Sequence, residues 1–253
     1  MQRNVRAVVV GGLGVVGSAT RKMLNIPHYW DARGSNITED ELHSSSYIFL
    51  CLPTPTVGGC CDVSALLYYF ELLGSNHVYI IRSTVIPGTA QRLAQEFGVP
   101  VLSNPEFLTE ALAEEECLQP DLIVLGADDE KERPLIWERF YSHIEFQHYM
   151  FTSTVMAEFI KYAVNTFYAS KVVFANALYQ CAEDLGLNYE AVKEALYARK
   201  WIGNNHLTVP WKGRFGADGK CLPKDLTAFA TFTAHPFFQF MDRTNQQLLA
   251  QGK

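Results

Sequence analysis

Short apolar runs and helical patterns alternate along the first half of the chain. The apolar runs are rich in β-branched and aromatic residues, as buried parallel strands are. They lie at 5–10, 28–31, 47–52, 78–82, 99–102 and 121–125. Turn or helical patterns separate them at 12–26, 65–73 and 90–97. Strands that alternate with helices predict an α/β fold with a Rossmann-like, doubly wound parallel sheet, which we expect over residues 1–150.

The pattern changes after residue 150. From 154 to about 185 the chain is rich in alanine, valine, aromatic residues and lysine, contains no proline or glycine, and is followed by Gly186. We predict one long helix there and a second over 189–197. This predicts a mainly helical domain with one long central helix over residues 151–253. Such a helix can bridge two lobes or form an interface, and we expect a homodimer through it.

Composition and charge exclude several classes of protein. The chain has 253 residues, 48% hydrophobic and 19% charged, which is typical of a globular protein. Its net charge of −6 argues against a nucleic-acid or membrane partner. The net charge does not exclude a local basic pocket that binds a phosphate. No apolar run of ~18 residues is present to span a membrane. The N-terminus lacks the apolar stretch of a signal peptide.

The six cysteines are scattered at 51, 60, 61, 117, 181 and 221, so we expect no disulfide framework. Cys60 and Cys61 are adjacent, which does not match zinc-ligand spacing, and the seven histidines show no metal-like spacing either. We therefore expect no metal and a reducing, cytoplasmic location.

A glycine-rich turn follows the first predicted strand. The segment Gly12-Leu13-Gly14-Val15-Val16-Gly17 is a G-x-G-x-x-G motif between a strand and a helix, the context that supports dinucleotide binding. Gly12 permits the tight turn, Gly14 lets the backbone approach a pyrophosphate, and Gly17 allows close helix–strand packing.

An acidic residue lies at the spacing expected for a ribose contact. Asp31 comes 19 residues after Gly12, near the usual spacing of about 20. The alternative is a solvated loop aspartate. We expect NAD as the cofactor, while Arg33 nearby leaves NADP open.

A second polar segment follows a later strand. Residues 104–110 lie where loops at the carboxyl ends of parallel strands carry ligand sites. Glu106 and Glu110 are four residues apart and share a face if the segment is helical. One interpretation is a carboxylate that activates water; the other is acidic charge at a helix N-terminus. The neighbouring Asn104-Pro105 favours the first interpretation for Glu106.

The long predicted helix carries polar residues on one face. Glu158, Lys161 and Asn165 have i, i+3 and i+7 spacing among largely apolar neighbours. A lysine and an amide on such a helix usually reach out to solvent. The alternative is that they converge on a substrate hydroxyl.

Cys221 has an environment unlike that of most core cysteines. It lies in Gly219-Lys220-Cys221-Leu222-Pro223-Lys224-Asp225. Nearby cations in general lower the pKa of a thiol and favour the nucleophilic thiolate. The alternative is a buried structural thiol, against which the charged, glycine-rich surroundings argue. A dinucleotide motif together with a covalent cysteine suggests oxidation beyond an aldehyde to an acid.

Taken together, these segments resemble the UDP-glucose/GDP-mannose 6-dehydrogenase family. The matching segments occur in the family's order and are 12–17, 51–56, 82–89, 103–110, 120–121, 158–165 and 213–225. The cysteine motif and Asn104-Pro105-Glu106-Phe107-Leu108 are the most specific. The resemblance implies NAD-dependent, four-electron oxidation of the C6 alcohol of a nucleotide sugar, with UDP-glucose the leading candidate.

The resemblance also implies roles for individual residues. Cys221 would be the nucleophile; Lys161, Asn165 and Asp225 would handle the hydroxyl proton; Glu106 would assist hydrolysis, and Thr84 would hold a water or the cofactor. Further cofactor contacts are expected at Leu13, Val15, Val16, Pro53, Thr54, Glu110 and Lys224, beside the glycines and Asp31. Further substrate contacts are expected at Phe107, Leu108, Gly213 and Phe215, beside Glu106, Lys161, Asn165 and Cys221.

Some features depart from the family pattern. Family members usually carry a further C-terminal domain, for which the 253 residues leave no room, so we expect a short form. Trp201 stands where an arginine is often found. Two alternatives therefore remain: a two-electron hydroxyacid-type dehydrogenase, which leaves Cys221 and Glu106 without a role, and a catalytically silent dinucleotide-binding or dimerisation module.

Overall fold

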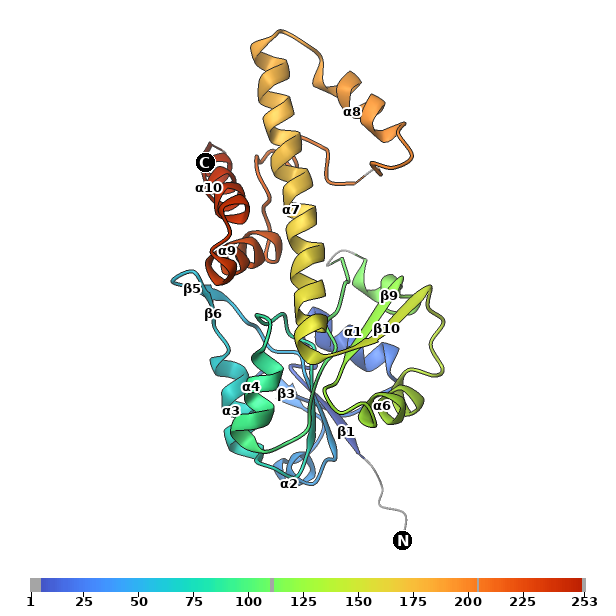
Figure 1. The fold of residues 1–253 in the computed structure, drawn as a ribbon. Coiled ribbons are helices and arrows are strands. Elements are labelled where there is room, and N and C mark those ends of the chain that lie inside the picture. Colours follow the sequence, from blue (N-terminus) through green and yellow to red (C-terminus); the bar gives the residue numbers. More distant parts are fainter. Residues whose placement is uncertain (1–5, 110–111, 204, 252–253) are drawn as a thin grey trace. The chain divides into compact units, whose positions relative to one another are not determined.

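A computed structural model describes residues 6–109, 112–203 and 205–251, and the chain divides into two compact units (Figure 1). Unit 1 consists of the chain up to Pro55 and of Cys61–Lys161, and unit 2 consists of Thr56–Cys60 and the chain from Tyr162 onward. The division therefore falls inside a helix. Glu110, expected above to contact the cofactor, lies outside the described residues.

Unit 1 is built on an eight-stranded sheet with the strand order β10-β9-β8-β7-β4-β1-β2-β3. Its strands are β1 (Ala7–Val10), β2 (Tyr29–Asp31), β3 (Gly34–Ser35), β4 (Tyr47–Leu50), β7 (Val78–Ile81), β8 (Val101–Ser103), β9 (Leu122–Gly126) and β10 (His148–Thr152). Neighbouring strands pair in parallel, except that β2–β3 and β8–β9 are antiparallel. The mostly parallel sheet predicted from the apolar runs is confirmed.

Helices cover both faces of this sheet (Figure 1). The helices of unit 1 are α1 (Val15–Met23), α2 (Glu39–His43), α3 (Ser64–Leu73), α4 (Thr89–Phe97), α5 (Ala113–Glu116) and α6 (Glu132–Phe140). Val8 and Val10 pack in one core cluster with α3 and α4, whereas Val9 packs in another with α1 and α6. Because successive residues of a strand face opposite sides, one apolar run serves both clusters.

Unit 2 is mainly helical. Helix α7 (Thr154–Asp184) begins in unit 1 and continues into unit 2, where α8 (Tyr189–Tyr197), α9 (Leu222–Thr233) and α10 (Pro236–Gln251) follow. Leu226 of α9 and Met241 of α10 pack with Ala169 of α7 in one buried cluster. A second cluster joins the later part of α7 to α8. A two-stranded hairpin, β5 (Thr56–Val57) with β6 (Cys60–Cys61), is bonded to α9 through Thr56 Oγ1, which donates to Lys224 O at 2.7 Å.

The long helix was predicted over nearly its observed length, and α8 was predicted with its observed bounds. Three helices that the apolar pattern did not reveal have a proline at or close to their start: Pro134 in α6, Pro223 in α9 and Pro236 in α10. A proline is tolerated there because the first N–H groups of a helix have no partner within it. No helix among the described residues is long and apolar enough to cross a membrane.

Candidate functional site

The glycine turn of unit 1 is tightly packed at two of its three motif positions. A Cβ on Gly12 would lie 2.4 Å from the Cβ of Tyr29, and a Cβ on Gly17 would lie 2.1 Å from the carbonyl oxygen of Gly11. A Cβ on Gly14, in contrast, would meet nothing closer than 3.4 Å. Gly12 and Gly17 are therefore required for packing, while Gly14 leaves room for a ligand.

Helix α1 begins directly after Gly14, which is its N-cap in extended conformation. Among the described residues no side chain caps this end, and its first turn contains no acidic residue. The first N–H groups of a helix lack partners within it and point toward positions where an anion binds favourably. The open backbone at Gly14 and these N–H groups fit the pyrophosphate of a dinucleotide.

Asp31 lies at the end of β2, next to the glycine turn. Its Oδ2 accepts a hydrogen bond from Leu13 N at 3.0 Å, and its Oδ1 accepts two from Arg33, at N and Nε, both 3.0 Å. The hydrogen bond from the Arg33 side chain is the main cause that lowers the pKa of Asp31 to about 2. Asp31 is therefore an ionised carboxylate attached to the turn, and it ends a strand instead of lying in a loop.

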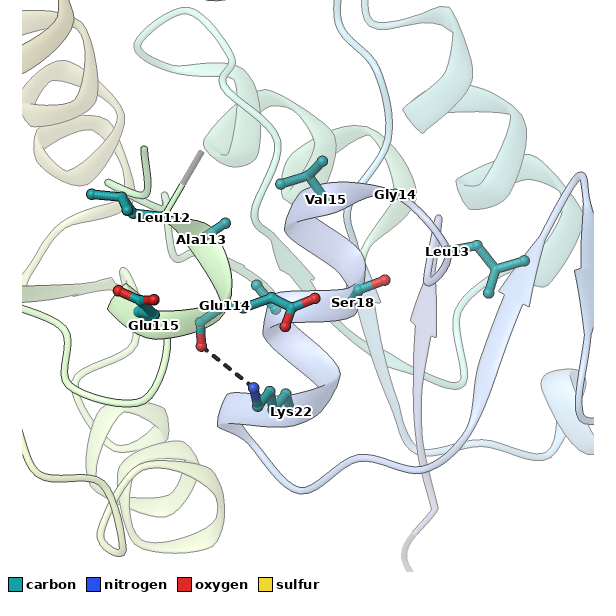
Figure 2. Close-up of a pocket in the computed structure, with 10 residues that line it drawn as sticks. Leu13, Gly14, Val15, Ser18, Lys22, Leu112, Ala113, Glu114 and Glu115 are labelled. Carbon is teal, nitrogen blue, oxygen red and sulfur yellow. Dashed lines mark hydrogen bonds between the residues drawn. The ribbon is translucent and has the colours of Figure 1, made fainter. Parts of the chain in front are cut away.

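A pocket of about 600 Å³ opens beside this turn (Figure 2). Leu13, Gly14 and helix α1 form one side of the pocket. The segment 112–115, which includes the start of α5, forms the other side. Lys22 Nζ reaches across to Glu114 O at 3.5 Å. The volume lies within the range of small-molecule sites. Val15 contributes to the pocket, whereas Val16 is half-buried and its carbonyl accepts from Thr20.

An ion pair between a buried lysine and a half-buried glutamate lies at the carboxyl edge of the same sheet. Lys161 Nζ is 3.3 Å from Glu106 Oε1, and the second oxygen of Glu106 accepts from Leu108 N at 2.6 Å. Lys161 is only 5% exposed and does not reach out to solvent. Its ammonium group also lies 5.5 Å from the centroid of the Phe107 ring. The structure thus brings together four of the residues predicted on segment 104–110 and on the long helix.

Asn104 fixes the start of this segment. Its Oδ1 accepts from Arg82 and, at 2.5 Å, from the hydroxyl of Tyr141, while its Nδ2 donates to Val124 O at 2.7 Å. All three side chains are buried. The amide therefore anchors the chain two residues before Glu106.

The loops after β4 and β7 are bonded to each other. The hydroxyl of Thr54 donates to Thr84 O at 2.6 Å, and Ser83 Oγ accepts from Leu52 N at 2.9 Å. Thr54 is buried, whereas Pro53 is exposed and Thr84 half-buried. The Thr54 hydroxyl thus donates its proton within the protein, which leaves its lone pairs and the Thr84 side chain for other contacts.

Unit 2 contains a second group of predicted site residues. Asn165 Nδ2 donates to Asp225 Oδ2 at 2.6 Å, and Lys224 Nζ donates to Asp225 Oδ1 at 2.5 Å. Asn165 is 6% exposed, so it too is buried instead of pointing to solvent. Cys221 is exposed and forms the N-cap of α9, the helix that carries Lys224 and Asp225. Thiols at helix N-termini are in general more readily ionised.

The comparisons with known proteins decide the family. Residues 30–145 match the NAD binding domain of the UDP-glucose/GDP-mannose dehydrogenase family, and residues 155–245 match its central domain. The chain belongs to this family. NAD is its cofactor, because the first match is to the NAD binding domain.

Individual members of the family show how much of them the chain resembles. A UDP-glucose 6-dehydrogenase of Rickettsia conorii is 33% identical over 204 residues, which are 77% of this chain and 46% of that protein. The chain thus spans about half the length of the curated relatives it matches.

Solved structures agree with this comparison. A UDP-glucose dehydrogenase of Pyrobaculum islandicum matches with a TM-score of 0.79 and 26% identity over 99% of this chain and 70% of that one. A UDP-D-ManNAc dehydrogenase of Pyrococcus horikoshii has a TM-score of 0.81 at 21% identity, over 96% of this chain and 69% of that one, which shows the shared fold.

Two buried amides of this family member were not found from the sequence. Asn245 on α10 accepts from Ala217 N at 2.6 Å and donates to Ala217 O at 3.1 Å, and Asn176 on α7 accepts from Gly216 N at 3.1 Å. They hold the loop that leads to Cys221. Their only trace in the sequence is a lone asparagine in a helical stretch.

The remaining predicted contacts lie in the same loop. Gly213 is exposed in a tight turn with a φ of 78°, and the ring of Phe215 is 5.7 Å from that of Tyr179. Phe215 thus packs in a core cluster of unit 2. Among the described residues no group of three or more histidine, cysteine or acidic side chains could hold a metal ion.

Proposed function

We propose that the chain catalyses the NAD-dependent oxidation of the C6 alcohol of a nucleotide sugar to a carboxylate, with UDP-glucose as substrate and UDP-glucuronate as product. The observation that carries the proposal is an exposed cysteine at the start of α9, four residues before an aspartate that is bonded to both an amide and an ammonium group. An alcohol oxidation alone needs no thiol. A thiol is useful where an aldehyde must be held and oxidised again.

The first step removes a hydride and a proton from the alcohol. NAD supplies the hydride acceptor. Asn165 and Lys161 donate hydrogen bonds to the alcohol oxygen, on which negative charge develops, and Asp225 takes up the proton, directly or through a water. The support is that these polar groups are buried, where electrostatic interactions are stronger than in water.

The second oxidation proceeds on the protein. The thiolate of Cys221 adds to the aldehyde carbon, and the resulting oxyanion takes a proton to give a thiohemiacetal. Loss of that proton and of a second hydride to a second NAD leaves a thioester. Water then attacks the thioester carbon, assisted by Glu106, and the thiolate leaves. For each alcohol group oxidised to an acid, two hydrides are transferred to NAD and one water molecule is consumed.

The cofactor contacts follow from the glycine turn. We assign the pyrophosphate to the first N–H groups of α1, beside the open backbone at Gly14, and the adenosine ribose to Asp31. Leu13, Val15, Pro53, Thr54, Thr84 and Lys224 are assigned supporting contacts. Phe107, Leu108, Gly213 and Phe215 are assigned to the sugar or its nucleotide. A thiol nucleophile has to stay reduced, so the cytoplasm is the compartment we propose.

A homodimer through α7 is part of the proposal. Large apolar side chains on this helix are exposed: Met156, Phe159, Phe167 and Phe174. Exposed apolar surface of this kind favours an interface over contact with water. Light scattering at micromolar protein would show twice the chain mass for a dimer, and a monomer mass would contradict this part of the proposal.

The test is the amount of NADH formed per mole of limiting UDP-glucose, with GDP-mannose in parallel. Two NADH and a uronate product are expected. One NADH would instead indicate a two-electron dehydrogenase, and no NADH with either sugar would indicate another nucleotide sugar or a silent binding module.

Two single cysteine variants, one of them a control, sharpen the test. Cys221→Ser should abolish acid formation while NAD binding is retained, because a serine hydroxyl is a far weaker nucleophile than a thiolate. Cys181→Ser, which removes another exposed cysteine, should leave the rate unchanged. Uronate production by Cys221→Ser at the wild-type rate would rule out the covalent role.

A further inference from the structure

Glu158 is a buried carboxylate that the proposed reaction does not use. It is 2% exposed and lies on α7, one turn before Lys161. Its Oε2 accepts from Gly88 N at 2.6 Å, and its Oε1 accepts from Ala90 N at 2.8 Å. Both oxygens are thus bonded to the N-terminus of α4, all within unit 1.

Helix α4 depends on this carboxylate for its cap. Its N-cap is Gly88, a glycine in the left-handed conformation that has no side chain to offer. The first N–H groups of a helix need acceptors, which a serine, threonine, aspartate or asparagine at the N-cap usually supplies. Here the acceptor comes from a residue 70 positions away in the chain. A carboxylate at this end of a helix also interacts favourably with the helix dipole.

The cap connects two parts of the proposed site. The turn that Glu158 holds begins four residues after Thr84, and Lys161 follows Glu158 by three residues on the same helix face. A second carboxylate fixes the beginning of α7, since Asp128 accepts from Thr154 N at 3.0 Å and from the Thr154 hydroxyl at 2.9 Å. The helix that carries Lys161 is therefore held at two successive turns, by the loop after β9 and by the start of α4.

We propose that Glu158 is a positioning residue that sets the ammonium group of Lys161 against Glu106 by fixing α7 to the start of α4. The inference rests on the function proposed above, in which Lys161 and Glu106 act on substrate. Glu158 itself touches neither substrate nor cofactor. Only the ionised carboxylate can accept from both N–H groups with both oxygens, since a protonated oxygen turns one acceptor into a donor.

The protonation state of Glu158 changes near neutral pH. Burial is the main cause that raises its pKa to about 7, against the opposing hydrogen bonds from the backbone of α4. Asp128 after β9 raises the pKa further. On the two helices that meet at Glu158, Lys161 lies one turn on along α7, and Arg92 of α4 is paired with Glu96. The cap therefore weakens as the pH falls through 7.

The experiment compares Glu158→Gln with wild type. A glutamine has nearly the same shape, but its NH2 group replaces one of the two acceptor oxygens, so one of the two cap bonds is lost at every pH. We expect kcat to fall by about tenfold with the KM for the sugar nearly unchanged, because a small misplacement of a reacting group mainly costs rate. In wild type we expect kcat to fall as the pH drops below 7, and this fall should be absent from the variant. Glu183→Gln, which removes an exposed carboxylate from the same helix, is the matched control and should behave as wild type.

A second readout does not depend on activity. The rate at which acetic anhydride labels Lys161, measured by mass spectrometry on the folded protein, should rise several-fold in Glu158→Gln and stay constant in the control, since the amine would leave its buried pair. If labelling and the pH profile are the same in Glu158→Gln and wild type, the positioning role is wrong. Another outcome is that labelling changes although neither wild type nor any variant forms NADH. In that case the proposed function is wrong, and the positioning of Lys161 by Glu158 stands.

Discussion

The glycine turn of unit 1 and the cysteine loop of unit 2 are held in opposite ways. In the turn, backbone atoms approach so closely that Gly12 and Gly17 have no space for a side chain. In the loop, the amides of Asn176 and Asn245 reach in and bond the backbone at 216–217. The close approach in the first segment depends on missing side chains at Gly12 and Gly17, although Asp31 also bonds Leu13 N, whereas the second segment depends on side chains that reach in from α7 and α10.

The difference determines how each segment responds to substitution. A turn held by close backbone contact fails when a methyl group is added at one of its closely packed positions, Gly12 or Gly17. A loop held by hydrogen bonds fails when a partner is removed, because its buried N–H and C=O groups then lack partners.

Gly17→Ala should unfold or severely weaken unit 1. The added Cβ would lie 2.1 Å from Gly11 O, so α1 or the turn has to move, at a cost of about 3 kcal/mol or more. Gly14→Ala is the matched control, because its Cβ would meet nothing closer than 3.4 Å. Thermal unfolding should show a large drop for Gly17→Ala only, while calorimetry should show weaker NAD binding by Gly14→Ala. Equal melting temperatures for the two variants would contradict the steric account.

Asn245→Leu should lower the free energy of unfolding by about 2 kcal/mol, because the N–H and C=O of Ala217 lose their partners in a buried place. Denaturant unfolding measures this loss. Gln246→Leu changes the exposed neighbour on the same helix and should have little effect. The alkylation rate of Cys221 should also change in Asn245→Leu, while that of Cys181 should not. A variant that keeps both the stability and the Cys221 rate would show that the amide does not hold the loop.

Asp31→Asn should have the smallest effect, on cofactor choice and acid stability. The carboxylate repels a ribose 2′-phosphate, so its loss should reduce the preference for NAD over NADP by about tenfold in the ratio of dissociation constants. Because the pKa is lowered from 3.8 to about 2, the carboxylate stabilises the fold above pH 4, and this contribution is lost as the pH falls through 2. The variant should lack this acid-dependent loss. An unchanged NAD/NADP ratio would remove the ribose role from Asp31.

The same contrast explains what could be predicted from the sequence. The glycine motif and the central strands are local patterns, since each strand is buried on both faces and is apolar along its length. Strand β10 was missed because it is an exposed edge strand with His148 and Tyr149 among its residues. The partners of Asn245, Asn176 and Glu158 lie 28, 40 and 70 residues away, so no local pattern reveals them.

The sequence predicts which residues belong to the candidate site, but it does not predict which of them pair with each other. Spacing alone favours solvent for Lys161 and Asn165 and leaves substrate as the alternative, because it cannot tell which face of a long helix is covered. Their pairing with Glu106 and Asp225 depends on contacts between segments 55 and 60 residues apart. The roles assigned to these residues stay predictions until the variants are measured.

Because the two units divide within α7, they cannot be exchanged like separate modules. Lys161 belongs to one unit and Asn165, one helical turn later, to the other. A gene fusion that joined this first unit to a foreign second one would have to cut through a continuous helix, and its register would have to be kept to the residue. New substrate preferences in such a protein should therefore arise from point changes in its loops, and recombination at the unit boundary should be rare.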